Sequence, residues 1–140
     1  MMSSYSVADR QRGAWIETMN GYIDMFVLPV PKKHLRAYCR TSQRYGRIMR
    51  EYGALEYREF LEEDLEAKGV GAFPSRIRLK RGEVLVSSVI GFRSKAHRDQ
   101  VYLRVQVDPR AQRMRREFAK NPITDLKRTL HGGFSTIVKV

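Results

Sequence analysis

The stretch YIDMFVL at residues 22–28 is aromatic and β-branched, which predicts a β-strand. Alternate side chains of a strand point to opposite faces of its sheet. One face would carry Ile23, Met25 and Val27, and the other Tyr22, Asp24, Phe26 and Leu28. Because both faces are mostly apolar, we expect this strand to be buried on both sides. Prolines at positions 29 and 31 would end it.

Periodicity and the positions of glycine and proline divide the rest of the chain. Apolar side chains at helical spacing predict a helix over residues 32–52, which Gly53 would end. The alternating segment ALEYREFLE predicts a strand over residues 54–62, and a short extended piece is expected over 76–80. The remaining expected elements are a strand over 83–92, a helix over 95–107 capped by Ser94, a short helix capped by Asp108 with Pro109 at its first position, and a strand over 134–140 after a Gly132-Gly133 turn.

The expected order is therefore β-α-β-β-α-β, the ferredoxin-like α+β plan, with an antiparallel sheet and helices on one face. We expect a single domain over residues 19–140, preceded by a flexible extension over residues 1–18, which show no apolar periodicity. Helices on one face leave the other face of the sheet open, and the strand over 22–28 is apolar on both. We therefore expect a homodimer whose two sheets pack face to face about a two-fold axis.

Composition narrows the function classes. The chain has 27 Lys and Arg against 15 Asp and Glu, a formal net charge of +12, which favours a polyanion partner. The single cysteine, Cys39, excludes an intramolecular disulfide and a cysteine-based metal cluster, and three scattered histidines make no metal motif. The sequence has no run of roughly 20 apolar residues and no secretory leader. We expect a cytoplasmic protein with no membrane partner, no metal and no indicated cofactor.

Four segments together resemble the YbaA-like family, a bacterial group of unknown function. They are GYIDMFVLPVPKKHLRAY, YGALEYRE, SKAHRDQVYLRVQVDPR and the closing GGF. The resemblance covers residues 19–140 and implies a dimeric α+β barrel fold, without an activity. The chain departs from the family pattern before the closing GGF, where it reads NPITDLKRTLHGGF. In similar dimeric barrels, the cleft between sheet and helices hosts small-molecule enzymes, so a ligand bound or converted there is our first functional hypothesis.

Asp24 and His97 are the candidate catalytic residues. A carboxylate on an apolar strand face is costly unless it is paired, and its pKa can be raised enough for acid–base chemistry. His97 would lie in the first turn of a helix, where the helix N-terminus favours a neutral imidazole. The alternatives are a structural ion pair between Asp24 and an arginine and a packing role for His97, and we favour these alternatives. Pairing of Asp24 with His97 or with Arg98 would make these residues structural.

Further side chains are candidates for lining the cleft. They are Tyr38, Tyr57, Ser87, Arg98 and His131, with Tyr45 as a third tyrosine at helical spacing. The tyrosines could hold a planar ligand, although aromatic side chains at this spacing more often belong to a core. No G-x-S-x-G segment surrounds Ser87, which argues against a serine nucleophile.

Four arginines support an alternative function as a basic module that binds RNA or another polyanion. Arg36, Arg40, Arg44 and Arg47 would share one helix face and could follow a row of phosphates. No recognisable RNA-binding motif accompanies them, so we favour the simpler interpretation of a solvated helix face. A purely structural role as a dimeric partner protein is the third hypothesis.

Overall fold

The computed structural model describes residues 21–140, which have an α+β fold. Its elements are β1 (Tyr22–Pro31), the 3-10 turn η1 (Lys32–His34), α2 (Leu35–Glu51), β2 (Glu56–Leu61), α3 (Phe73–Ile77), β3 (Glu83–Phe92), α4 (Lys95–Gln106), α5 (Pro109–Lys120), the 3-10 turn η2 (Leu126–Arg128) and β4 (Leu130–Ser135). The four strands form one sheet in the order β2-β3-β1-β4, with every neighbouring pair antiparallel. The expected β-α-β-β-α-β order is confirmed. The proposed extension over residues 1–18 lies outside the described residues.

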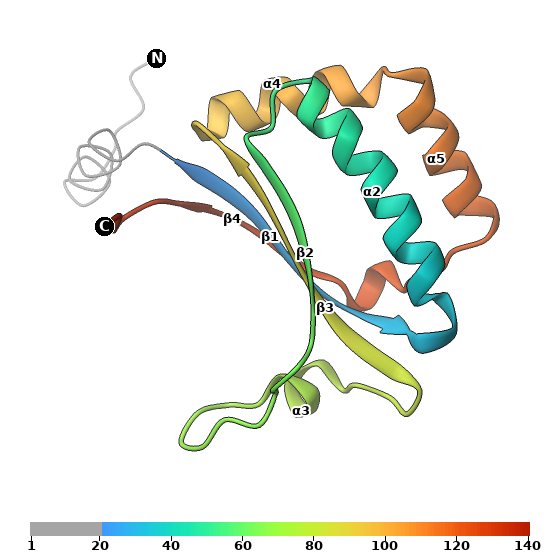
Figure 1. Cartoon of the computed structure of the whole chain (residues 1–140), viewed down its shortest axis with the longest axis vertical. Helices are drawn as coiled ribbons and strands as arrows, with labels where there is room; N and C mark the ends of the chain where they lie inside the picture. The colour runs from blue at the N-terminus through green and yellow to red at the C-terminus, as the bar shows by residue number, and fades with distance from the viewer. Residues whose placement is uncertain (1–20) are drawn as a thin grey trace, which may run out of the picture.

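Helices α2, α4 and α5 lie together on one side of the sheet (Figure 1). Side chains from all three helices and from the central strands form the main core there. Its largest fully buried members include Phe92 on β3, Met49 on α2 and Val101 and Val105 on α4. This arrangement confirms the expected covering of one sheet face by helices. Within residues 21–140, no helix is both long and apolar enough to cross a membrane.

Strand β1 continues through both prolines, three residues further than the sequence predicts. The backbone N–H of Lys32 donates a hydrogen bond to the carbonyl of Gly82, next to β3. Because backbone hydrogen bonds alternate between the two sides of a strand, even-numbered residues of β1 bond to β3 and odd-numbered residues bond to β4. β4 pairs with β1 only as far as Val27. The missing N–H groups of Pro29 and Pro31 therefore face an edge where no ladder bond is needed.

Two expectations about local structure are wrong. Residues 76–80 are not an extended piece: they include the end of the short helix α3, which Arg78 closes with a left-handed backbone (φ 56°). The last strand is β4 at Leu130–Ser135, not residues 134–140, and Gly132 and Gly133 lie within it. The end of β4 is set by its partner, because Ser135 pairs with Tyr22, the first residue of β1.

The capping predictions are confirmed at both helix starts. The Ser94 hydroxyl accepts a hydrogen bond from the backbone N–H of His97 at the start of α4. The Asp108 carboxylate accepts one from the backbone N–H of Arg110 at the start of α5, where Pro109 occupies the first position. Each bond satisfies a backbone donor that the helix itself leaves unpaired.

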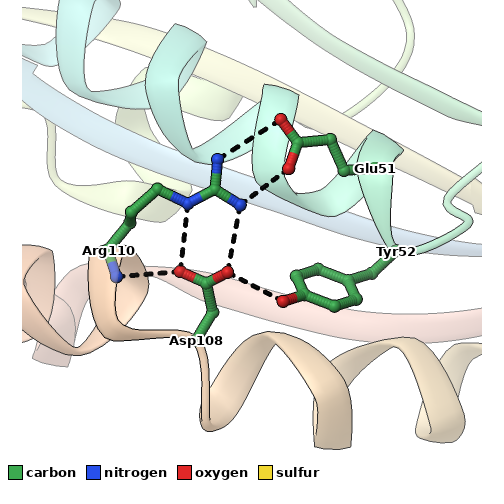
Figure 2. A network of polar contacts seen from close by, with 4 residues as sticks. All are labelled: Glu51, Tyr52, Asp108 and Arg110. Atoms are coloured by element: carbon green, nitrogen blue, oxygen red, sulfur yellow. Dashed lines mark hydrogen bonds and ion pairs between the residues drawn. The ribbon is translucent and has the colours of Figure 1, made fainter.

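A polar network joins the end of α2 to the start of α5 (Figure 2). The Arg110 guanidinium contacts both Glu51 carboxylate oxygens, at 2.6 and 3.3 Å, and also both oxygens of Asp108. The Tyr52 hydroxyl donates to the second Asp108 oxygen at 2.8 Å. The hydrogen bonds from Arg110 and Tyr52 hold the pKa of Asp108 below its usual range. This network fixes the angle at which α5 leaves the core, and α5 supplies one wall of the cleft described next.

Candidate functional site

A cleft lies between α2, α5 and the helix-covered face of the sheet. It consists of an outer hollow of about 550 Å³ and an inner hollow of about 300 Å³. The two hollows share Tyr38, Tyr45, Tyr57, Glu59, Thr124 and Leu126, so they are parts of one cleft. Sites for small molecules commonly have volumes of about 300–1,000 Å³. The cleft is therefore large enough for a ligand with one or two rings.

Strand register explains which sheet residues form the floor of the cleft. Ser88 and Ile90 of β3 pair with Glu59 and Tyr57 of β2, and paired residues of a sheet share a face. Phe26 and Leu28 of β1 complete the floor. From the helices, Tyr102 of α4 lines the inner hollow and Phe118 of α5 lines the outer hollow. The lining is mostly aromatic and aliphatic, with few polar groups.

Glu59 is the acidic group of the cleft. One of its carboxylate oxygens accepts hydrogen bonds from Ser42 at 2.6 Å and Tyr57 at 3.4 Å, and the other accepts from Tyr38 at 2.9 Å. The hydroxyl oxygens of Ser42 and Tyr57 are also 2.9 Å apart and share a hydrogen bond. Among residues 21–140, no Lys, Arg or His lies within ion-pair distance of Glu59. The hydrogen-bond partners of Glu59 in this part of the chain are therefore hydroxyl groups.

The hydroxyls around Glu59 act as donors at neutral pH. Burial raises the pKa of Tyr38, and the neighbouring Glu59 carboxylate raises it further. Burial also raises the pKa of Tyr57; the hydrogen bond with Ser42 opposes this change, and Glu59 adds to it. Because both phenols stay protonated, they can bind a ligand through their hydroxyl groups or their ring faces without adding charge to the cleft.

A second polar cluster surrounds Asp24 beside the cleft. Its side chain is fully buried, and one carboxylate oxygen accepts from Arg98 at 3.0 Å and contacts the His131 ring nitrogen at 3.2 Å. Arg98 also pairs with Asp99 and lies over the rings of Tyr22 and Tyr102. Burial lowers the pKa of Arg98, but Asp24, Tyr22 and Asp99 together outweigh it, so the net pKa is raised.

The structure thus brings together three of the residues expected in the cleft, Asp24, Arg98 and His131, but none of them is a lining residue. The Phe26 ring separates this cluster from the inner hollow: it lines the hollow and stacks on His131 with ring centres 4.3 Å apart. The pairing of Asp24 with Arg98 is the structural alternative that the sequence suggested. In chemical terms, Asp24 orients the imidazole of His131, whose ring is partly exposed.

His97 lies away from both the cleft and Asp24. Its Nδ1 accepts a hydrogen bond of 3.0 Å from the backbone of Arg93, between β3 and α4, and its ring lies edge-on to Phe92. Burial lowers the pKa of His97, and the charges of Arg93 and Arg104 lower it further. The imidazole is therefore neutral and joins β3 to α4.

Among the other expected residues, Tyr38, Tyr45 and Tyr57 line the cleft. Ser87 does not, because it lies next to the cleft-lining Ser88 on β3 and therefore points to the open face of the sheet. Sequence reasoning missed Glu59 as a cleft residue. The signal was present in ALEYREFLE, where alternation puts Glu59 on the same face as Tyr57.

The four arginines of α2 are exposed, as a helix face in solvent would be. Arg44 and Arg47 border a separate hollow of about 210 Å³, together with Arg110 and Arg113 of α5. Residues 21–140 contain no group of His, Cys, Asp and Glu side chains placed to share a metal ion.

Comparison with known proteins gives a family match over most of the described region. A family model described as "Protein of unknown function (DUF1428)" matches residues 21–122. The chain is 31% identical over 117 residues to "Uncharacterized protein YbaA" of Escherichia coli K12 and to its Shigella flexneri counterpart, covering 84% of this chain and 97% of each relative. The solved structure of "De novo designed protein Foldit4" aligns with 85% of the chain, at 14% identity and a TM-score of 0.39.

Proposed function

We propose a function from the geometry of the cleft, because the chain belongs to DUF1428, a family described as proteins of unknown function. The proposal is that the protein binds a small, mostly apolar molecule with at least one flat ring in the cleft between α2, α5 and the sheet. The observation that supports it is the lining: Tyr38, Tyr45 and Tyr57 converge around the single carboxylate of Glu59. Apolar walls provide the area for binding, and a few fixed polar groups set the orientation.

A blocking substitution tests this proposal. Thr124 lines both hollows from the loop that precedes η2, outside the buried core, so Thr124→Trp should fill the cleft without disturbing the core. We would screen one- and two-ring aromatic fragments by ligand-observed NMR and repeat the titrations on this variant. Fragment binding should be lost in Thr124→Trp and kept in Ile137→Trp, a control at an exposed position outside the cleft. If no fragment binds, or if both variants bind equally well, the proposal is wrong.

We also propose that two copies associate through the open face of the sheet. Strand register places Ile23, Met25, Val27, Val89, Phe60, Leu130 and Phe134 on this face, together with Leu85, which is already buried within the single chain. Phe60, Leu130 and Phe134 are 39%, 56% and 53% exposed in the single chain. A second copy is the fitting partner because the same apolar face, applied to itself about a two-fold axis, covers both sheets.

Polyanion binding is the second candidate function. The observation that favours it is the hollow between α2 and α5, where Arg44, Arg47 and Arg113 add three charges that have no carboxylate partner among residues 21–140. Binding of a single-stranded RNA should weaken steeply with salt. Changing these three arginines to Gln should weaken binding much more than a charge-matched change of Arg76, Arg81 and Lys139. Equal losses of RNA affinity in the two variants would show that net charge alone, and not this hollow, accounts for the binding.

A further inference from the structure

We propose that the cleft selects an organic cation, a protonated amine or quaternary ammonium group on an apolar body, held between Glu59 and the tyrosine rings. This inference rests on the proposed function, because it names the class of ligand that the same cleft would take.

The first observation is the unneutralised charge of Glu59. Three other partly or fully buried carboxylates have an arginine: Asp24 pairs with Arg98, Asp108 with Arg110, and Glu83 with Arg128. Glu62, which lies outside the cleft, instead accepts a hydrogen bond from the backbone N–H of Leu85. Glu59 is also partly buried, yet its partners are three hydroxyl groups. In a chain of net charge +12, a carboxylate with no ion-pair partner among residues 21–140, beside an apolar cleft, is complementary to a positively charged ligand.

The second observation is the arrangement of aromatic rings beside that carboxylate. The rings of Tyr45 and Tyr57 are 6.3 Å apart between centres and inclined by 64°, so they form a corner, and Tyr38 also lines the cleft. The face of an aromatic ring attracts a cation, and rings that surround an ammonium group are a recurrent solution for binding it. Burial raises the pKa of all three phenols, so the rings stay neutral.

The charges inside the cleft also argue against an anionic ligand, whereas Arg40, Arg47 and Arg50 line a neighbouring hollow that Glu59 also borders. An anion in the inner hollow would meet the Glu59 carboxylate directly. The arginine that lines the outer hollow, Arg115, donates to the backbone carbonyl of Gln106, at the junction of α4 and α5. Arg115 therefore has a partner of its own at the rim, whereas the carboxylate deeper in the cleft has only hydroxyl donors.

Three probes of nearly equal shape but different charge test the proposal. Benzyltrimethylammonium carries the cation, neopentylbenzene replaces its nitrogen by carbon, and phenylmethanesulfonate carries a negative charge. Each would be titrated into the full-length protein and followed by NMR or calorimetry. We expect the cation to bind about tenfold or more tightly than its neutral isostere, and the anion to bind weakest.

Glu59→Gln removes the charge and keeps oxygen and nitrogen atoms at the same place. It should abolish the preference for the cation and leave the affinity of the neutral isostere unchanged. Glu56→Gln is the matched control: Glu56 belongs to the same strand, points to the opposite face and is exposed beside Arg58. It should change neither affinity. Tyr45→Leu is a second variant, which removes a ring face and leaves the hydrogen bonds of Glu59 in place. It should weaken the binding of the cation more than the binding of the neutral isostere.

The outcomes separate this inference from the proposed function. If cation and isostere bind equally well in the cleft, the cation preference is wrong and the ligand-binding function stands. If the anion binds best, or if Glu59→Gln strengthens the binding of the cation, the inference is overturned. If none of the probes binds and Thr124→Trp changes nothing in the fragment screen, both proposals fail together.

Discussion

Asp24 shows how one buried charge can organise several elements. Its side chain is fully buried on β1, and one of its oxygens contacts Arg98 of α4 and His131 of β4. A buried charge loses its hydration and is tolerated only with partners of this kind. We assign Asp24 a structural role, because its known partners are fixed protein groups and it does not line the cleft.

Neutralising Asp24 should therefore destabilise the fold. Asp24→Asn leaves the mostly buried Arg98 guanidinium without its buried partner, and breaking such a pair costs about 3 kcal/mol or more. The control is Asp99→Asn, which removes the other carboxylate on Arg98; that carboxylate is 54% exposed, so the loss should be about 0–1 kcal/mol. Chemical denaturation of both variants measures the difference, and equal losses would contradict the assignment.

At Gly46 of α2, a close contact with the Tyr57 ring outweighs the usual preference of helices for alanine over glycine. Glycine inside a helix is normally less stable than alanine by about 1 kcal/mol. Here, however, an added Cβ at position 46 of α2 would lie 2.5 Å from the Tyr57 ring. The missing side chain is what allows the Tyr57 ring to lie against α2 and form a wall of the cleft.

We predict that Gly46→Ala destabilises the protein by about 1 kcal/mol, because the cost of overpacking exceeds the gain in helix propensity. In a Tyr57→Ala background the same change should be stabilising, since the ring it strikes is gone. Thermal or urea unfolding of the four variants of this double-mutant cycle gives the coupling. A stabilising effect of Gly46→Ala in the wild-type background would show that the ring moves away freely.

At the scale of elements, the junction of β3 and α4 depends on a neutral histidine. His97 donates its backbone N–H to Ser94 and accepts a backbone hydrogen bond from Arg93 at Nδ1. A proton on Nδ1 would remove that acceptor. This explains in structural terms why the folded state disfavours the charged form and lowers the pKa of His97, together with burial and the nearby arginines.

The sign of the resulting pH effect follows from linkage. The unfolded chain binds a proton on His97 near the ordinary pKa of about 6.5, whereas the folded chain binds it only at lower pH. The contribution of His97 to the free energy of unfolding is therefore complete above about pH 6.5. It is lost as the pH falls towards the lowered pKa of His97 in the folded state. Urea unfolding between pH 7.5 and 5 should show this loss in the wild type and a flatter profile in His97→Asn. Parallel profiles would disprove the role of His97.

The whole molecule presents one face of its sheet that none of its three long helices covers, and this is where its oligomeric state should be decided. Helices α2, α4 and α5 cover the other face (Figure 1). Apolar side chains from all four strands lie on the open face, with Phe134 on the edge strand β4. Exposed apolar surface of this kind supports the proposed association of two copies.

We expect sedimentation at micromolar concentration to give twice the mass of one chain. Phe134→Glu places a charge on the open face and should give a monomer with an unchanged circular dichroism spectrum. Leu103→Glu, at a similarly exposed apolar position on α4, should leave the dimer intact. A monomeric wild type, or dissociation by Leu103→Glu alone, would refute association through the sheet.

The sequence by itself determined the order of elements and the caps of two helices. These depend on local chemistry: alternation for the strands, Ser94 and Asp108 as N-caps, and Pro109 in the first turn of α5. It also indicated that Tyr38, Tyr45 and Tyr57 could face a ligand. By contrast, the end of β4 depends on where its partner β1 begins, and the path of β1 through two prolines depends on where β4 stops.

Only the tertiary structure decided which polar residues meet. Asp24 and His131 are 107 residues apart, and Tyr38 and Glu59 are 21 apart, so neither contact follows from spacing along the chain. His97 was a catalytic candidate for which a packing role was favoured; it joins β3 to α4, because its ring nitrogen accepts from the backbone N–H of Arg93. Local patterns specify which backbone hydrogen bonds a segment can make. The partners of a buried charge are specified by the packing of helices on the sheet, which brings distant side chains to one place.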